Sequence, residues 1–80
     1  MKRQNMQIIR MYGLIGEREG ASGKHQTLEL NLMKWKDGRP VYDLRWWEDD
    51  RPLYGISINE QSLAELGEMI DYIFEEENKQ

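Results

Sequence analysis

Polar and apolar positions alternate along four stretches of the chain before the pattern changes to a helical period. The alternation is clearest in residues 26–35, where Leu28, Leu30 and Leu32 fall on one side of an extended strand. The stretch 41–47, VYDLRWW, alternates in the same way. Residues 6–16 and 53–58 are rich in isoleucine and aromatic residues, as strands typically are. The pattern predicts four strands.

Short turn sequences separate these stretches. KDGRP, with Asp-Gly at its centre, predicts a hairpin between the second and third strands. EDDRP separates the third strand from the fourth, and the Gly- and Ser-rich REGASGKH separates the first from the second. Consecutive strands joined by such short connections pair in antiparallel fashion.

Residues 60–77 have the spacing of an amphipathic helix. Asn59 is a good N-cap, and Ile58 and Leu63 have the spacing of a hydrophobic staple across it. The apolar stripe of this helix consists of Leu63, Leu66, Ile70, Ile73 and Phe74. Gly67 interrupts the stripe, which indicates either a close approach by another backbone or a tolerated glycine.

The predicted fold is therefore α+β: residues 1–80 form a single domain with a four-stranded antiparallel sheet followed by one C-terminal helix. One helix can cover only one face of the sheet. We expect it to meet the apolar face, which consists of Leu28, Leu30, Leu32, Tyr42, Leu44, Trp46, Ile56 and Ile58. The other face then carries Met33, Trp35, Val41, Asp43, Arg45 and Trp47.

This second face has the chemistry of a platform for single-stranded nucleic acid. Trp46 is expected in the core, whereas Trp35 and Trp47 are expected to be displayed beside Arg45. Arg10 and Tyr12 join them if the first strand is in register, and Lys34, Lys36 and Arg39 lie at or near the hairpin end. Displayed rings stack on bases while cations neutralise phosphates. Tryptophans on a sheet face also pack into cores or dimer interfaces, so both alternatives stay open at this point.

Composition narrows the class of protein. Eighty residues bury a thin core, and the absence of cysteine excludes disulfides and cysteine-based metal sites. No apolar run approaches the about 20 residues that span a bilayer, so we expect a soluble, cytoplasmic protein with no membrane partner. The net charge of −4 is unevenly spread: residues 1–51 carry +2 and residues 52–80 carry −6. A polyanion would therefore bind the sheet rather than the helix.

Other chemistry is weakly supported. His25 is the single histidine, and no candidate nucleophile lies near it in the sequence. The run Glu48, Asp49 and Asp50 lacks the spacing of a calcium loop and is read as an exposed turn. We therefore expect no enzyme activity, no metal site, no cofactor and no small-molecule substrate.

The ordered motifs resemble those of the positive cofactor four family of transcriptional coactivators, and most closely its YdbC-like bacterial branch. They are ELN at 29–31, Trp35, a turn ending in Pro40, YDLR at 42–45, Trp47 and then YGISINEQSLAEL. The resemblance covers about residues 26–70. It implies a ββββα homodimer that binds single-stranded DNA, with RNA as the alternative ligand, and with Trp35, Arg45 and Trp47 at positions matching the family's site. Met33 and Tyr54 stand where family members can carry basic residues, and the chain is more acidic than many of them.

The sequence thus supports two classes of function. The first is a sequence-tolerant, single-stranded DNA-binding protein with a role in transcription, replication or repair. The second is a protein-interaction module that buries a partner on the same aromatic face. Dimerisation, through the helices and one strand edge, is a separate expectation that also rests on the thin core and on Gly67.

Overall fold

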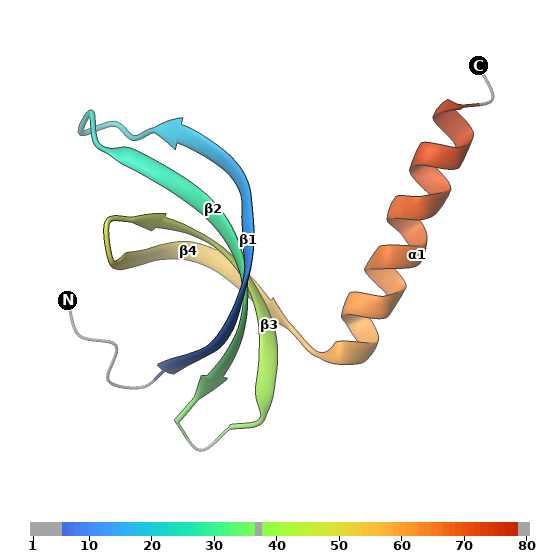
Figure 1. Ribbon diagram of the computed structural model, residues 1–80, viewed down its shortest axis with the longest axis horizontal. Helices are drawn as coiled ribbons and strands as arrows, with labels where there is room; N and C mark the ends of the chain where they lie inside the picture. The colour runs from blue at the N-terminus through green and yellow to red at the C-terminus, as the bar shows by residue number, and fades with distance from the viewer. Residues whose placement is uncertain (1–5, 37, 79–80) are drawn as a thin grey trace.

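The computed structural model describes residues 6–36 and 38–78 and has the predicted architecture (Figure 1). Four antiparallel strands form one sheet in the order β1-β2-β3-β4, and a single helix follows. The elements are β1 (Met6–Glu19), β2 (His25–Trp35), β3 (Pro40–Glu48), β4 (Arg51–Ile58) and α1 (Glu60–Glu77).

The register of the two central strands confirms the two faces expected from alternation. Leu30 lies opposite Leu44, and Asn31 lies opposite Asp43, so the apolar and the polar positions are each paired with their own kind. The amide of Gly38 donates to the carbonyl of Trp35 at 2.9 Å and closes the predicted hairpin. Asp37, which was expected at the centre of that turn, lies outside the described residues.

The sheet curves strongly away from the helix (Figure 1). We call the side towards the helix the helix face, and the opposite side, which carries Asn31 and Asp43, the concave face. The buried apolar residues Met6, Met33 and Trp47 form one cluster, with Ile8 and Trp35 packed against it. Alternation places Met33, Trp35 and Trp47 on the concave face, so the best-buried apolar cluster lies on the side that we had expected to be open.

Three irregularities interrupt the pairing of β1 with β2. The register shifts between Ile8 and Arg10, between Met11 and Gly13, and between Leu14 and Gly16. Each shift adds one residue to β1, as a β-bulge does, and a bulge bends its strand and increases its twist. The first shift also reverses which side chains of β1 face which way: Ile8 lies opposite Met33, but Arg10 lies opposite Leu32.

Helix α1 begins where the sequence predicts, because the side chain of Asn59 accepts a hydrogen bond from the Ser62 amide at 2.7 Å. The helix nevertheless buries none of its residues, and Phe74 at its far end is 60% exposed. An apolar groove of about 320 Å³ lies between its first turns and the sheet. The groove is lined by Ile15, Leu30, Tyr42, Leu44, Ile56, Ile58, Leu63, Leu66 and Ile70. In the described part of the chain, no helix has the length and apolar character needed to cross a membrane.

Candidate nucleic-acid interface

The burial of the two adjacent tryptophans of β3 is the reverse of the order expected from the sequence. Trp47 is only 2% exposed, whereas Trp46, on the helix face, is half-buried. The prediction that Trp47 is displayed is therefore wrong, although its assignment to the face of Met33 and Asp43 is right. The physical reason is curvature: a bent sheet brings the side chains of its concave face together, so that Met33 and Met6 cluster with the Trp47 ring.

Trp35 is the tryptophan of the concave face that keeps accessible surface. It ends β2, packs against the buried cluster of Met6, Met33 and Trp47, and is half-buried. The guanidinium carbon of Arg45 lies 6.0 Å from the centroid of its ring. The buried cluster on one side of the Trp35 ring and the Arg45 cation beside it hold the ring in a defined orientation. Stacking of a base on the ring requires such an orientation.

Arg45 is held by a dense set of hydrogen bonds on the concave face. Its Nε and one terminal nitrogen donate to both carboxylate oxygens of Asp43, at 3.0 and 2.9 Å. Its other terminal nitrogen donates to the carbonyl of Leu53 at 2.7 Å, and the Ser57 hydroxyl donates to Asp43 at 2.7 Å. Because Asp43 is fully buried, this ion pair is strong and directional. Arg45 therefore links β3 to β4 beside Trp35, and three of its five N–H groups are already engaged.

Asn31 lies beside Asp43 in the neighbouring strand and is also fully buried. Among the described residues, neither its amide nitrogen nor its amide oxygen has a hydrogen-bond partner. Leaving such a group unsatisfied costs about 1–3 kcal/mol. The centre of the concave face thus contains a polar side chain whose hydrogen-bonding capacity the fold does not use.

Arg10 and Tyr12 do not lie on the concave face. The Tyr12 ring is 6.0 Å from the ring of Tyr42, and the Arg10 guanidinium lies over Tyr12 at 5.2 Å. Charge repulsion from Tyr12 raises the pKa of the Tyr42 phenol above its ordinary value, which reflects the same proximity. The condition on which these two residues were assigned, an unbroken register in the first strand, fails at the bulge after Ile8.

Lys34, Lys36 and Arg39 are exposed at the hairpin between β2 and β3, as expected. Lys36 follows Trp35 directly, and Arg39 lies across the turn from it. Lys34 shares the side of Leu32 by alternation, so it points to the helix face. Lys36 and Arg39 are therefore the hairpin cations considered for phosphate contacts near Trp35, and Lys34 is not.

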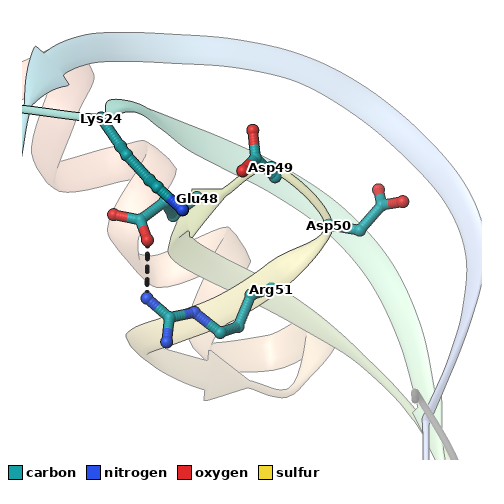
Figure 2. Close-up of a pocket in the computed structure, with 5 residues that line it drawn as sticks. All are labelled: Lys24, Glu48, Asp49, Asp50 and Arg51. Carbon is teal, nitrogen blue, oxygen red and sulfur yellow. Dashed lines mark hydrogen bonds and ion pairs between the residues drawn. The ribbon is translucent and has the colours of Figure 1, made fainter. Parts of the chain in front are cut away.

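The acidic turn between β3 and β4 has an ion pair at its base (Figure 2). Arg51 donates to the buried Glu48 at 2.6 Å, and Asp50 points away from this pair. Asp49 adopts a positive φ of 55°, which tight turns often require. Among the described residues, no group of three or more His, Asp or Glu side chains is arranged to hold a metal ion. His25, the single histidine of the chain, is exposed and pairs with Glu17 at 2.9 Å.

One cluster was not expected from the sequence. At the end of the sheet formed by the β1–β2 connection, the Arg18 guanidinium lies 3.9 Å from the ring centroid of Trp46 and 5.4 Å from that of Tyr54. The three residues come from three strands, and Arg18 is far from the other two in the chain. Gly16 gives no local signal for the cluster, because a β-carbon there would lie 3.9 Å from the Trp46 ring, an ordinary van der Waals contact.

In comparisons with known proteins, no family model matches this chain, and no curated protein matches it significantly. The resemblance to the positive cofactor four family accordingly stays a prediction.

Proposed function

We propose that this protein binds single-stranded DNA without strong sequence preference, through a site centred on Trp35. The observation that carries the proposal is the Trp35 ring itself. It is the accessible aromatic of the concave face, it rests on a buried apolar cluster, and Arg45 lies beside it. Stacking of a base on such a ring contributes about 1–3 kcal/mol.

The roles of the individual residues in this site differ from those expected from the sequence. Trp47 supports the platform from below instead of stacking on a base, because it is buried. Arg45 orients Trp35, since Asp43 and Leu53 engage its guanidinium. Lys36 and Arg39 supply the phosphate contacts from the neighbouring hairpin. Among the described residues these are two cations, which release few counterions, so the affinity should fall with salt but with a shallow slope.

The test is a titration of the protein with oligo-dT, followed by tryptophan fluorescence at low and moderate salt. We expect quenching by the single strand, weaker binding at higher salt, and no comparable effect of a duplex of equal length. Trp35→Ala should weaken binding by about 1–3 kcal/mol.

Tyr72→Ala is the matched control, because it removes an exposed aromatic side chain from the helix and leaves the sheet unchanged. It should bind as the parent does. Equal affinities of Trp35→Ala and the parent would remove Trp35 from the site. No binding of either at low salt would refute the proposal. Trp47→Ala is unsuitable as a binding variant, because emptying a buried site of this size costs about 3–5 kcal/mol of stability.

A protein-interaction module is the second candidate, favoured by the net charge of −4 and by the few cations that the described residues place around the concave face. The partner would cover the Trp35 ring. Binding to a protein that persists at high salt, together with no affinity for oligonucleotides, would support this alternative.

The proposal includes a homodimer, no enzymatic activity and a cytoplasmic location. The dimer is supported by the apolar stripe of α1, since the helix buries none of its residues against its own sheet. The absence of cysteine suits a reducing compartment. The acidic helix lies on the side of the sheet opposite the concave face, so it is kept away from a nucleotide bound at Trp35 (Figure 1).

A further inference from the structure

The cluster of Arg18, Trp46 and Tyr54 lies on the helix face, at the opposite end of the sheet from Trp35. The guanidinium of Arg18 is close enough to both rings for cation–π attraction. It covers Trp46, whereas Tyr54 is 65% exposed and offers its ring to solvent. The cluster thus pairs one accessible aromatic ring with one cation.

A hydrogen-bonded chain fixes the orientation of Arg18. Its Nε donates to the Gln26 side-chain oxygen at 2.7 Å, and the Gln26 amide donates to Glu48 at 3.0 Å. Arg51 donates to Glu48 at 2.6 Å, so each of the four strands supplies one member of the chain. Gln26 is more than nine-tenths buried, which makes it a rigid anchor. Among the described residues, the terminal nitrogens of Arg18 have no hydrogen-bond partner and can still donate.

A shallow pocket of about 420 Å³ opens beside these groups. The pocket is lined by Arg18, Gln26 and Tyr54. Gly20 and Ala21 also line it, and these small residues occupy little space. Glu19 adds a carboxylate, which disfavours a bare anion but accepts hydrogen bonds from the N–H groups of bases. A ligand that combines a flat ring with a phosphate fits this set of groups better than either part alone.

We propose that this pocket is a second nucleotide site, in which a base stacks on Tyr54 while a phosphate accepts hydrogen bonds from the terminal nitrogens of Arg18. The inference rests on the proposed function, because the ligand is a distant part of the same single strand. Gln26 lies nine residues before Trp35 in β2, which is about 30 Å of strand at roughly 3.3 Å per residue. The two sites also lie on opposite faces of the sheet, so a nucleic-acid strand that joins them must pass around its edge. Only a long oligonucleotide can occupy both.

The experiment compares oligo-dT of about 4 and about 16 nucleotides, lengths that bracket common site sizes. Tyr54→Ala should weaken binding of the long oligonucleotide about tenfold and leave binding of the short one unchanged, since one stacked base contributes roughly that factor. Tyr54→Phe, which keeps the ring, should bind as the parent does. Arg18→Gln should behave like Tyr54→Ala, whereas Lys24→Gln, which removes an exposed cation from the same end of the sheet, should lose clearly less.

Because Tyr54 is exposed, its truncation tests the site even if Arg18→Gln fails to fold. Equal binding of the long oligonucleotide by the parent and Tyr54→Ala would overturn the second site and leave the proposed function intact. An equal loss at both lengths would overturn it as well, because Tyr54 would then belong to the first site. If the parent binds neither length, both proposals fail.

Discussion

Asp43 is a fully buried charged side chain on the concave face. It accepts two hydrogen bonds from Arg45 and one from Ser57, and it is completely buried. The carboxylate therefore depends on these donors for the solvation that it has lost, and the donors in turn hold β3 and β4 together at this point.

We predict that Asp43→Ala lowers the free energy of unfolding by about 3 kcal/mol, because it leaves Arg45 without its partner in a mostly buried place. Ser57→Ala removes one hydrogen bond and should cost only about 1 kcal/mol. Urea denaturation of the two variants checks both values. Similar losses for the two would contradict the central role given to the ion pair.

Glu48 gives the stability a dependence on pH. The hydrogen bond from Gln26, followed by the attraction of Arg51, holds the pKa of this carboxyl below its ordinary value despite its burial. A lowered folded-state pKa means that the ionised group stabilises the protein above its unfolded pKa of about 4.3. That contribution is lost as the pH falls through the lower, folded-state value.

Glu48→Gln should therefore be less stable than the parent at neutral pH, and the difference should shrink below about pH 4. Thermal unfolding of both proteins between neutral and acidic pH measures this directly. A difference that stays constant through the acidic range would mean that ionised Glu48 is not what stabilises the fold.

At the scale of elements, Gly67 is the least explained residue of the helix. A β-carbon there would meet no atom of this chain within 4 Å, so the backbone of the same chain does not approach it. The close approach considered from the sequence must then come from a second molecule or not occur at all.

We predict that Gly67→Ala increases the helicity of the monomer, since alanine is favoured by about 0.5–1 kcal/mol, but weakens the dimer. Circular dichroism at low concentration and sedimentation at micromolar concentration separate the two effects. A dimer as tight as that of the parent would place Gly67 outside the interface.

The elements themselves were predictable, because each depends on signals that are local in the chain. The helix begins after Asn59 as its capping chemistry requires, and β2 and β3 follow the alternation of leucines closely. The faces were predictable only where pairing is regular. Arg10 and Tyr12 moved to the other face because bulges are not visible in the spacing of apolar residues. Trp47 is better buried than Trp46, the reverse of the expectation. Alternation predicts on which face of the sheet a side chain lies, but the curvature of the sheet determines which face is buried.

Considered as a whole, the molecule exposes far more apolar surface on its helix side than a small monomer normally does. Ile70, Ile73 and Phe74 stay accessible along one side of α1, and the groove beneath the helix is apolar. Patches of this kind usually mark an interface. A second copy of the chain would bury two such stripes at once.

Phe74→Glu should therefore convert the dimer to a folded monomer, because Phe74 is 60% exposed and contributes little to the fold of one chain. Tyr72→Glu is its counterpart on the opposite side of the helix, where the side chain is 62% exposed, and should remain dimeric. Sedimentation at micromolar concentration distinguishes the two. A monomeric parent, or a dimeric Phe74→Glu, would contradict an interface built on the stripe.

The bulges of β1 have a consequence for solubility. β1 is a 14-residue edge strand of the sheet, and its exposed apolar residues are Ile9, Met11, Leu14 and Ile15. A long edge strand with exposed apolar residues promotes the addition of strands from further chains. The register of β1 breaks after Ile8, Met11 and Leu14, so its outward N–H and C=O groups are not evenly spaced for long enough to template a partner strand. The bulges that curve the sheet thus also protect an apolar edge strand from amyloid-like addition of further chains.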